Sequence, residues 1–430
     1  MSYAEGKNFN YAIKLTQTID DDRVRTTTLA TIAIAFAENK QFYKAIGLAE
    51  TIEDFYTKSQ ALTSIALKYV QAGHLDKAAT VASKSLQIAD SIREYLNKAE
   101  ALTQISEIYT HIGENDKASE LLSQAWMNVT LSTDTAFFIK STKIRTLMKI
   151  ADEYTKIELH ETASIVLQQA QKVAHSINIE NLKDRHLFYI ALQYAQIGQE
   201  DAAIKVAETI KNIEMKGHTL AQIVGEIVKD DEYDRAIRLA KTINHIPARG
   251  EALAFVGVKF AKDKEYDRAL KIIETIDDAY AKAYALVWLS VKYAEDNSNE
   301  KAVEQLSKAL EIIESTEDGF FKVLAFVKVA EQYTKIGQEG KTLEILSEAF
   351  NGATIIEDDY LKPTALQAIA EVYVKVGEYY QSLTVTGAIE NPYLKIMTLG
   401  QINQNLIETG KRLDAQSKQL LREMSSDVAL

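Results

Sequence analysis

Cysteine is absent from this chain of 430 residues, and proline and glycine are scarce, with 3 and 17 copies. The lack of thiols excludes disulfides, catalytic cysteines and cysteine-based zinc sites. So few turn-forming residues exclude a fold of many short strands and tight turns. No apolar run approaches the roughly 18 residues of a membrane-spanning helix. The opening MSYAEGKNFNYAIK contains no apolar core of a secretory signal. We therefore expect a cytoplasmic protein without a membrane span.

Excess positive charge is also missing. Lysine and arginine number 49 against 61 aspartates and glutamates, which gives a net charge of −12, and the two signs are interleaved. Binding of nucleic acid requires a basic stripe, so we expect no nucleic-acid partner. What the chain does contain is 47% hydrophobic residues, rich in alanine, leucine and isoleucine, which favours a helical protein with an ample core.

One segment recurs along the chain. ETIEDFYTKSQALTSIALKYVQ at 50–71 returns as ETIDDAYAKAYALVWLSVKYAE at 274–295, with ten identical letters. Aligned on the basic residue of this segment, eleven copies are found, mostly 33 or 40 residues apart. The aligned residues are Arg25, Lys58, Lys98, Lys143, Lys183, Lys216, Arg249, Lys282, Lys322, Lys362 and Lys395. Internal repetition at this period indicates a solenoid.

Each copy predicts a helix, a turn and a second helix. In the first half, Leu62, Ile65, Ala66 and Tyr69 follow the i, i+3, i+4, i+7 spacing of a helix face. Glycines mark the turn, where a left-handed residue ends a helix cheaply. They are Gly73, Gly113, Gly198, Gly337, Gly377 and Gly410. Acidic residues between copies, such as Asp54 and Asp278, are expected to cap the next helix.

Two places in the copy predict packing. The Tyr69 place is aromatic in nine copies, which predicts core residues between adjacent units. They are Phe36, Tyr69, Tyr109, Tyr154, Tyr194, Phe260, Tyr293, Tyr333 and Tyr373. The Ala78 place is small throughout, which predicts a close crossing of the two helices. Its members are Ala45, Ala78, Ala118, Ala163, Ala203, Ala236, Ala269, Ala302, Thr342, Ser382 and Ala415, with Ala12 in a partial copy.

The repeats predict one solenoid over 1–430. A partial repeat at 1–24 precedes the repeats at 25–57, 58–97, 98–142, 143–182, 183–215, 216–248, 249–281, 282–321, 322–361, 362–394 and 395–430. Seven extra residues add two turns, about 10 Å, and keep the apolar stripe on the same face. The copies that are 40 residues long should therefore have longer second helices.

The ends of the array are expected to differ from its middle. Tyr3 aligns with a first-helix aromatic, so the array begins late inside a repeat, and a helix near 412–424 closes the other end. A first unit without its partner helix leaves apolar surface exposed. We expect this end either to pair with another molecule, such as a second copy of the chain, or to continue in a longer native chain.

The spacing Leu-x2-Ile-Ala-x2-Tyr-x3-Gly-x-aromatic-x2-Ala resembles the tetratricopeptide repeat family. The best copy has Leu253, Val256, Gly257, Phe260, Tyr266, Ala269 and Ile273. The resemblance extends from about residue 9 to 424, although an acidic link replaces the family's usual proline and leucine its usual tryptophan. It implies an all-α, right-handed superhelical solenoid of about 11 helix-turn-helix repeats, with about 23 helices and an N-terminal partial repeat.

Catalytic chemistry is not indicated. GQEGKT at 337–342 ends like a phosphate-binding loop, but Lys335 stands where that motif needs glycine. The seven histidines are scattered singly, without the spacing that places two metal ligands on one helix face. We therefore expect no enzyme activity, no catalytic residue, no metal and no cofactor.

The resemblance implies that a ligand lies against the first helices, at places two, five, six, nine and twelve after the Lys58-type residue. These places are polar near the N-terminus, with Thr27, Thr31, Gln60, Thr63 and Ser64. From 183 to 294 they are largely aromatic or apolar. The candidate partner-binding residues there are Phe188, Tyr189, Leu192, His218, Phe255, Tyr284 and Trp288. Phe255 and Trp288 fit a core role equally well.

Basic residues at the same places offer an anion contact. Some members of the family bind a partner's C-terminal carboxylate with a clamp over three repeats, and Arg145 and Lys149 occupy its last two basic places. Gln104, Leu67 and Thr63 do not match the rest of the clamp. We therefore expect at most a local contact at Arg145 and Lys149. Glu331–Lys335 and Glu371–Lys375 have the spacing of i,i+4 ion pairs.

These observations favour a non-enzymatic scaffold that binds a partner protein or peptide through the groove of the first helices. The alternative is a regulator in which the groove closes on a short peptide or small ligand. A fused output segment in the full-length gene would favour the regulator.

Overall fold

The computed structural model describes residues 9–133, 135–317 and 319–427. In these residues it has 23 α-helices and no strand, so the predicted all-α array of helix-turn-helix repeats is confirmed. The chain divides into two compact units, unit 1 (Met1–Thr219) and unit 2 (Leu220–Leu430), which are described separately. The prediction of a single solenoid domain over 1–430 stays a prediction.

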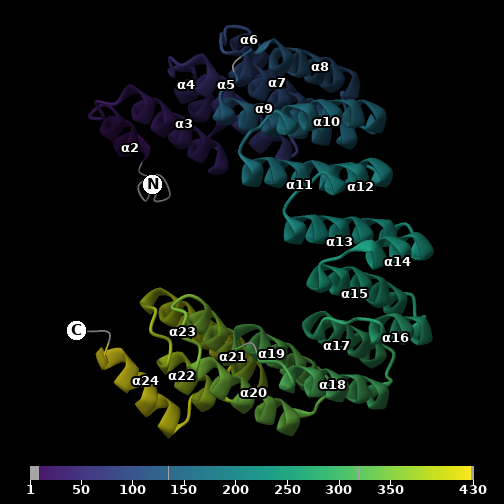
Figure 1. Ribbon diagram of the computed structural model, residues 1–430. Coiled ribbons are helices and arrows are strands. Elements are labelled where there is room, and N and C mark those ends of the chain that lie inside the picture. The colour runs from purple at the N-terminus through teal and green to yellow at the C-terminus, as the bar shows by residue number, and fades with distance from the viewer. Residues whose placement is uncertain (1–8, 134, 318, 428–430) are drawn as a thin grey trace. The chain divides into compact units, whose positions relative to one another are not determined.

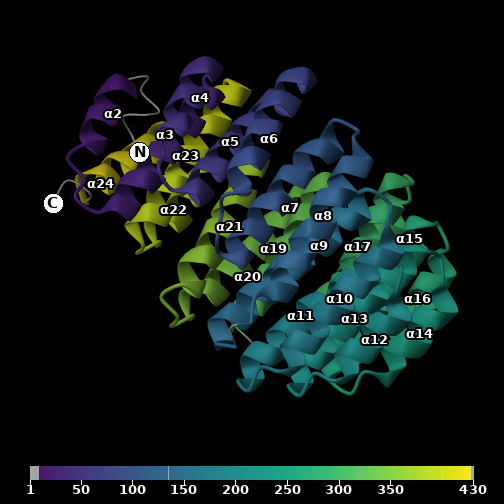
Figure 2. The ribbon, with the colours of Figure 1, turned by 90° about the horizontal axis from the view of Figure 1, so that it is seen from above.

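In unit 1, first and second helices alternate along the chain (Figures 1 and 2). The first helices are α3 (Asp22–Glu38), α5 (Phe55–Gln71), α7 (Tyr95–His111), α9 (Phe137–Lys156) and α11 (Glu180–Gln196). The second helices are α2 (Phe9–Thr16), α4 (Phe42–Glu50), α6 (Leu75–Ala89), α8 (Asn115–Leu131), α10 (His160–His175) and α12 (Glu200–Glu208). The division into units falls within the next first helix, α13 (Ile213–Lys229).

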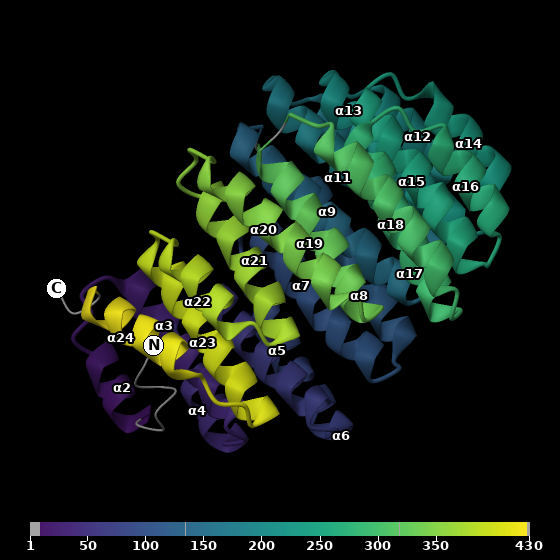
Figure 3. The same ribbon diagram turned by 90° about the horizontal axis from the view of Figure 1, so that it is seen from below.

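Unit 2 repeats the same alternation, and its last helices are clearest in Figure 3. The first helices are α15 (Ile246–Lys262), α17 (Ala279–Glu295), α19 (Gly319–Lys335), α21 (Leu361–Val376) and α23 (Pro392–Thr409). The second helices are α14 (Tyr233–Thr242), α16 (Tyr266–Glu274), α18 (Asn299–Glu314), α20 (Glu339–Thr354), α22 (Tyr379–Gly387) and α24 (Ala415–Asp427).

The first helices form the inner layer of each unit. Consecutive first helices pack against one another, as α3 does with α5 and α17 with α19. The second helices pack mainly on the first helices before and after them, with α22 and α24 as an exception. Consecutive first helices lie closer together than consecutive second helices, and in a curved array the closer elements are on the concave side. The first helices therefore form the inner surface, on which the predicted binding residues lie.

The long and short second helices follow the repeat lengths. In the compact repeats α12, α14 and α16 have 9, 10 and 9 residues, whereas α6, α8, α10, α18 and α20 have 15 to 17. The prediction that the seven inserted residues extend the second helix is confirmed.

Every turn between the two helices contains one left-handed residue. All six predicted glycines have positive φ, from 65° at Gly410 to 86° at Gly377. The other five copies adopt the same backbone with a side chain present. These residues are Lys40, Glu158, Asp231, Lys264 and Asn297, with φ between 58° and 64°. The turn geometry is therefore a property of the repeat and not of glycine.

The recurring alanines and aromatics form the core, as predicted. Every member of the Ala78 place from Ala45 to Ser382 is fully buried, which lets the two helices of a hairpin approach closely. The nine aromatics are at most 6% exposed. The Tyr69 ring stacks on Phe42 of the preceding repeat with 3.9 Å between centroids. At the C-terminal end the alignment slips, because Ala415 is exposed and Ser417 is buried instead.

Side chains cap the helix ends at several of the links between repeats. Asp54 and Asp278 accept hydrogen bonds from the backbone N–H of Thr57 and Ala281, at 2.7 and 2.8 Å, so the predicted capping by the acidic link is confirmed. In several repeats the aligned basic residue caps the other helix end. Lys322, for example, donates to the carbonyl of Glu314 at the end of the preceding second helix, at 2.7 Å.

Two predictions concern the chain ends. Tyr3, on which the N-terminal partial repeat was based, lies outside the described residues, and pairing through this end stays a prediction. The closing helix predicted near 412–424 is α24, which packs on α22 with Met424 in a small core beside Leu383 and Ile402.

Candidate functional site

The seven predicted aromatic and apolar residues divide between the two units. Those on α11 and α13, with His218 as the last, belong to unit 1, and those on α15 and α17 belong to unit 2. Tyr189 and Tyr284 are 50% and 52% exposed, and the remaining five are half-buried. None of the seven is a fully buried core residue, unlike the Tyr69-type aromatics.

On α11 two rings form an aromatic pair at the surface of unit 1. Phe188 and Tyr189 lie edge to face with 5.0 Å between their centroids. Leu192 is half-buried one turn further along the same helix. His218 on α13 is half-buried and has interactions of its own. These residues can offer apolar contact area, but they do not enclose a ligand by themselves.

Phe255 has a structural role in unit 2. A Cβ atom added at Gly225 on α13 would lie 3.3 Å from the Phe255 ring, so this glycine makes room for the ring. Phe255 thus packs on the backbone of the preceding first helix and keeps part of its surface exposed. Its position combines the core and surface roles that the sequence left open.

Tyr284 and Trp288 line an apolar groove of about 560 Å³ between α17 and α19. We call this the α17–α19 groove. It is lined by Tyr280, Ala283, Tyr284, Val287, Trp288, Val291, Ile313, Phe321, Leu324, Ala325, Lys328, Glu331, Gln332 and Lys335. The Tyr284 and Trp288 rings lie edge to face at 6.2 Å, and Tyr280 and Phe321 are 6.0 Å apart. The groove therefore has an aromatic wall contributed by two consecutive repeats.

Several groove residues were missed by the sequence interpretation. Leu324 and Lys328 occupy ligand-facing places of the next repeat, so extending the same alignment by one repeat would have found them, whereas Glu331 was named only as an ion-pair partner of Lys335. Tyr280 and Phe321 precede the aligned basic residue, where the repeat pattern gave no signal.

Glu331 carries the negative charge of the groove and is held by two lysines. Lys328 and Lys375 lie 2.9 and 2.8 Å from its carboxylate oxygens. Burial alone would raise the pKa of Glu331, but the hydrogen bonds from Lys375 and Lys328 hold it below its ordinary value. The predicted Glu331–Lys335 and Glu371–Lys375 pairs are wrong, because Lys375 reaches across from α21 to Glu331 and Gln367 donates to Glu371.

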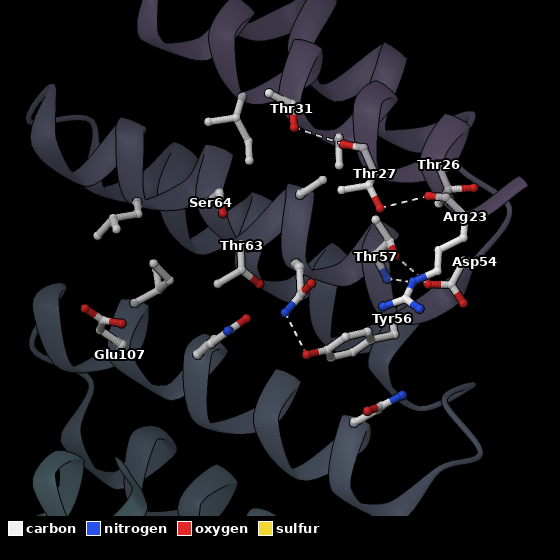
Figure 4. A pocket seen from close by; sticks show the side chains of 18 of the residues that line it. Arg23, Thr26, Thr27, Thr31, Asp54, Tyr56, Thr57, Thr63, Ser64 and Glu107 are labelled. Atoms are coloured by element: carbon white, nitrogen blue, oxygen red, sulfur yellow. Dashed lines mark hydrogen bonds between the residues drawn. The ribbon is translucent and has the colours of Figure 1, made fainter. Parts of the chain in front are cut away.

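A second hollow, of about 980 Å³, lies against α3, α5 and α7 in unit 1. We call it the polar groove. Figure 4 shows Arg23, Thr27 and Thr31 from α3 around the same hollow as Thr63 and Ser64 from α5. The ligand-facing places are polar here, whereas they are aromatic in the α17–α19 groove.

A chain of hydrogen bonds beside the polar groove links α5 to α7. Gln60 donates to the Tyr56 hydroxyl at 2.8 Å, and that hydroxyl donates to Glu100 on α7 at 2.7 Å. Burial, followed by the hydrogen bond to Glu100, raises the pKa of Tyr56 well above its ordinary value. The hydroxyl therefore stays protonated and acts as a fixed donor within the protein.

Arg145 and Lys149 lie on α9 and are both exposed. Lys149 lies 3.3 Å from Glu100, and Arg145 donates to the Thr142 hydroxyl at 3.5 Å. His186 is half-buried, and burial and then the charges of Arg185 and Arg145 lower its pKa. Glu100 already offsets part of the positive charge of Arg145 and Lys149. An anion contact at these two residues stays a prediction.

The described residues contain no cluster of three or more acidic or histidine side chains arranged to hold a metal. None of the helices formed by these residues has the length and apolar character needed to cross a membrane.

Each of the two units is an array of tetratricopeptide-like helical hairpins, defined by its first and second helices, the left-handed turn and the small and aromatic packing places. No protein-family model matches the chain, and a comparison with curated proteins finds no match.

Solved structures similar to the chain include three natural proteins. Yeast Tom70 is 12% identical, with 98% of this chain and 97% of that one covered and a TM-score of 0.34. A Rap protein complexed with Competence and Sporulation Factor is 13% identical, with coverage of 86% and 97% and a TM-score of 0.30. Ton1535 from Thermococcus onnurineus NA1 is 16% identical, with coverage of 93% and 97% and a TM-score of 0.28. Scores below 0.5 establish no common global shape, so the assignment depends on the repeat geometry.

Proposed function

We propose that this chain is a non-enzymatic scaffold that binds a partner protein or peptide, with the α17–α19 groove as a principal contact. One observation supports the proposal above the others. Tyr284 and Trp288 expose aromatic surface at places where unit 1 has Gln60 and Ser64. Because the same repeat folds with polar residues there, folding does not require these aromatics.

The lining of the groove fits a polypeptide ligand. Large aromatic side chains in a groove are the usual anchors of protein interfaces, since they bury much area at little entropic cost. Two first helices supply the wall, and their charged residues lie along the same groove. The net charge of −12 favours a protein over a nucleic-acid partner. The α11 pair Phe188 and Tyr189 would offer a separate apolar contact on unit 1.

The proposal is tested by affinity capture from native extract with the whole chain and with Tyr284→Ala and Trp288→Ala. Loss of a buried aromatic anchor weakens binding by about 2 kcal/mol or more, roughly thirtyfold in affinity. A partner retained by the parent should therefore be lost from both variants. Gln60→Ala and Ser64→Ala, at the same places of a repeat in unit 1, should retain it.

Thermal unfolding of the same variants separates binding from packing. Tyr284 is 52% exposed, so its removal should leave the melting temperature nearly unchanged. Tyr333→Ala, at a core place that is 2% exposed, should destabilise by about 3–5 kcal/mol. If Tyr284→Ala and Trp288→Ala capture the partner normally, or melt as low as Tyr333→Ala, the proposed site is wrong.

A further inference from the structure

Lysines surround the single carboxylate of the α17–α19 groove. Lys328 and Lys335 line the groove with Glu331, and Lys375 reaches Glu331 from α21. The Glu331 side chain is 18% exposed, whereas those of Lys328 and Lys375 are 64% and 55% exposed. Lys335 is exposed and has no ion pair within the described residues. The carboxylate is thus covered by cations that themselves face solvent.

The local charge is opposite to that of the whole chain. Three lysines and one glutamate give this cluster a net positive charge, in a chain whose total is −12. The apolar wall formed by Tyr284, Trp288 and Leu324 lies in the same groove as Lys328 and Lys335. A segment that buries an apolar side chain against this wall therefore places its neighbouring residues beside the ammonium groups of Lys328 and Lys335.

We infer that the segment received by the α17–α19 groove is an acidic amphipathic peptide, with an aromatic or aliphatic anchor and a carboxylate a few residues away. This inference rests on the proposed function of the groove. The apolar wall takes the anchor, and Lys335 and Lys328 take the carboxylate. A basic segment is disfavoured, because Glu331 is already hydrogen-bonded to two lysines and offers a cation little.

In this arrangement Glu331 competes with the ligand. Its carboxylate forms ion pairs with Lys328 and Lys375 in the free protein, so a ligand carboxylate must compete with Glu331 for these lysines. Glu331→Gln removes the competing charge and releases both lysines toward the groove. This substitution should strengthen binding of an acidic segment, whereas it should weaken binding of a basic one and leave a neutral one unchanged.

The experiment selects short random peptides displayed on phage against the whole chain and discards those that also bind Trp288→Ala. The peptides that depend on Trp288 should carry aspartate or glutamate near an aromatic or aliphatic residue more often than the starting library. One such peptide, labelled with fluorescein, is then titrated by fluorescence anisotropy. Its affinity should rise roughly threefold for Glu331→Gln and fall roughly threefold for Lys335→Gln, with both effects reduced at high salt.

A matched control comes from α20, where Lys341 and Glu344 form an exposed pair at 2.8 Å outside the groove. Lys341→Gln and Glu344→Gln should leave the affinity unchanged. Peptides without charge bias, or a Glu331→Gln variant that binds equally or more weakly, overturn the inference and leave the scaffold proposal intact. A selection that yields no Trp288-dependent peptide contradicts the proposed function itself. Should Glu331→Gln fold poorly, the exposed Lys335→Gln variant still decides the question.

Discussion

The left-handed turn residue allows a stability prediction that isolates the backbone. Glu158 and Lys40 adopt φ of 64° and 59°, the conformation that glycine supplies in six other copies. A left-handed residue with a side chain costs roughly 1–2 kcal/mol. Glycine loses about 0.5–1 kcal/mol more backbone entropy on folding. Glu158→Gly and Lys40→Gly should therefore each stabilise their repeat by about 0.5–1 kcal/mol.

Two further substitutions test whether the backbone conformation of the turn residue causes this change in stability. A Cβ at Gly113, where φ is 84°, would meet no heavy atom within 4 Å, so Gly113→Ala changes the backbone preference without a clash. It should destabilise by about 1 kcal/mol. Lys264→Gly gains the same backbone relief but loses the ion pair of Lys264 with Asp296 at 2.8 Å. An exposed pair contributes about 0–1 kcal/mol, so the net change should be near zero.

Native-state hydrogen exchange is the appropriate assay, because long repeat arrays need not unfold in one step. In Glu158→Gly, amide exchange in α9 and α10 should slow roughly two- to fivefold through local opening. In Gly113→Ala, exchange in α7 and α8 should accelerate by a similar factor. If both substitutions move exchange in the same direction, the turn conformation does not set the stability of the repeat.

Two further predictions concern packing and pH. Ala203 is fully buried where α11 and α12 cross, so Ala203→Leu should destabilise by about 1–3 kcal/mol, measured by urea unfolding against Ala203→Gly. Overpacking is refuted if the leucine variant is as stable as the parent. Burial raises the pKa of Tyr194 to about 12, so its contribution to stability is intact below pH of about 10 and is lost as pH rises toward 12. The urea midpoint of Tyr194→Phe should therefore fall less than that of the parent between pH 9 and pH of about 12. An unchanged pH profile would contradict the assignment of this loss to Tyr194.

The architecture could be predicted from the sequence because most features that define the repeat depend only on residues close together in the chain. The spacing of Leu62, Ile65, Ala66 and Tyr69 defines a helix face without any knowledge of the neighbours, and Gly73 marks its end. The left-handed turn residue could not be predicted in every repeat. Lys40 occupies the same left-handed place as Gly73, but lysine carries no conformational signal of its own.

The ion pairs of the groove show the same limit. The i,i+4 spacing suggested that Glu331 pairs with Lys335, its neighbour on α19. In the structure Glu331 binds Lys375, which is 44 residues away, because curvature brings consecutive first helices together. Pairs between repeats depend on how closely α19 and α21 pack, and spacing along one helix does not contain that information.

The binding places were predictable in part, and the reason lies in what the repeat leaves open. Burial fixes the residues at the Ala78 and Tyr69 places in nearly every repeat, since the repeats pack through them. The places of Gln60 and Tyr284 face the inner surface, where polar and aromatic residues fold equally well. Side chains there are free to differ between the polar groove and the α17–α19 groove. Recognition of the proposed partner should therefore reside in these unconstrained places, and exchange of side chains between equivalent places, such as Gln60 and Tyr284, should alter the ligand without altering the fold.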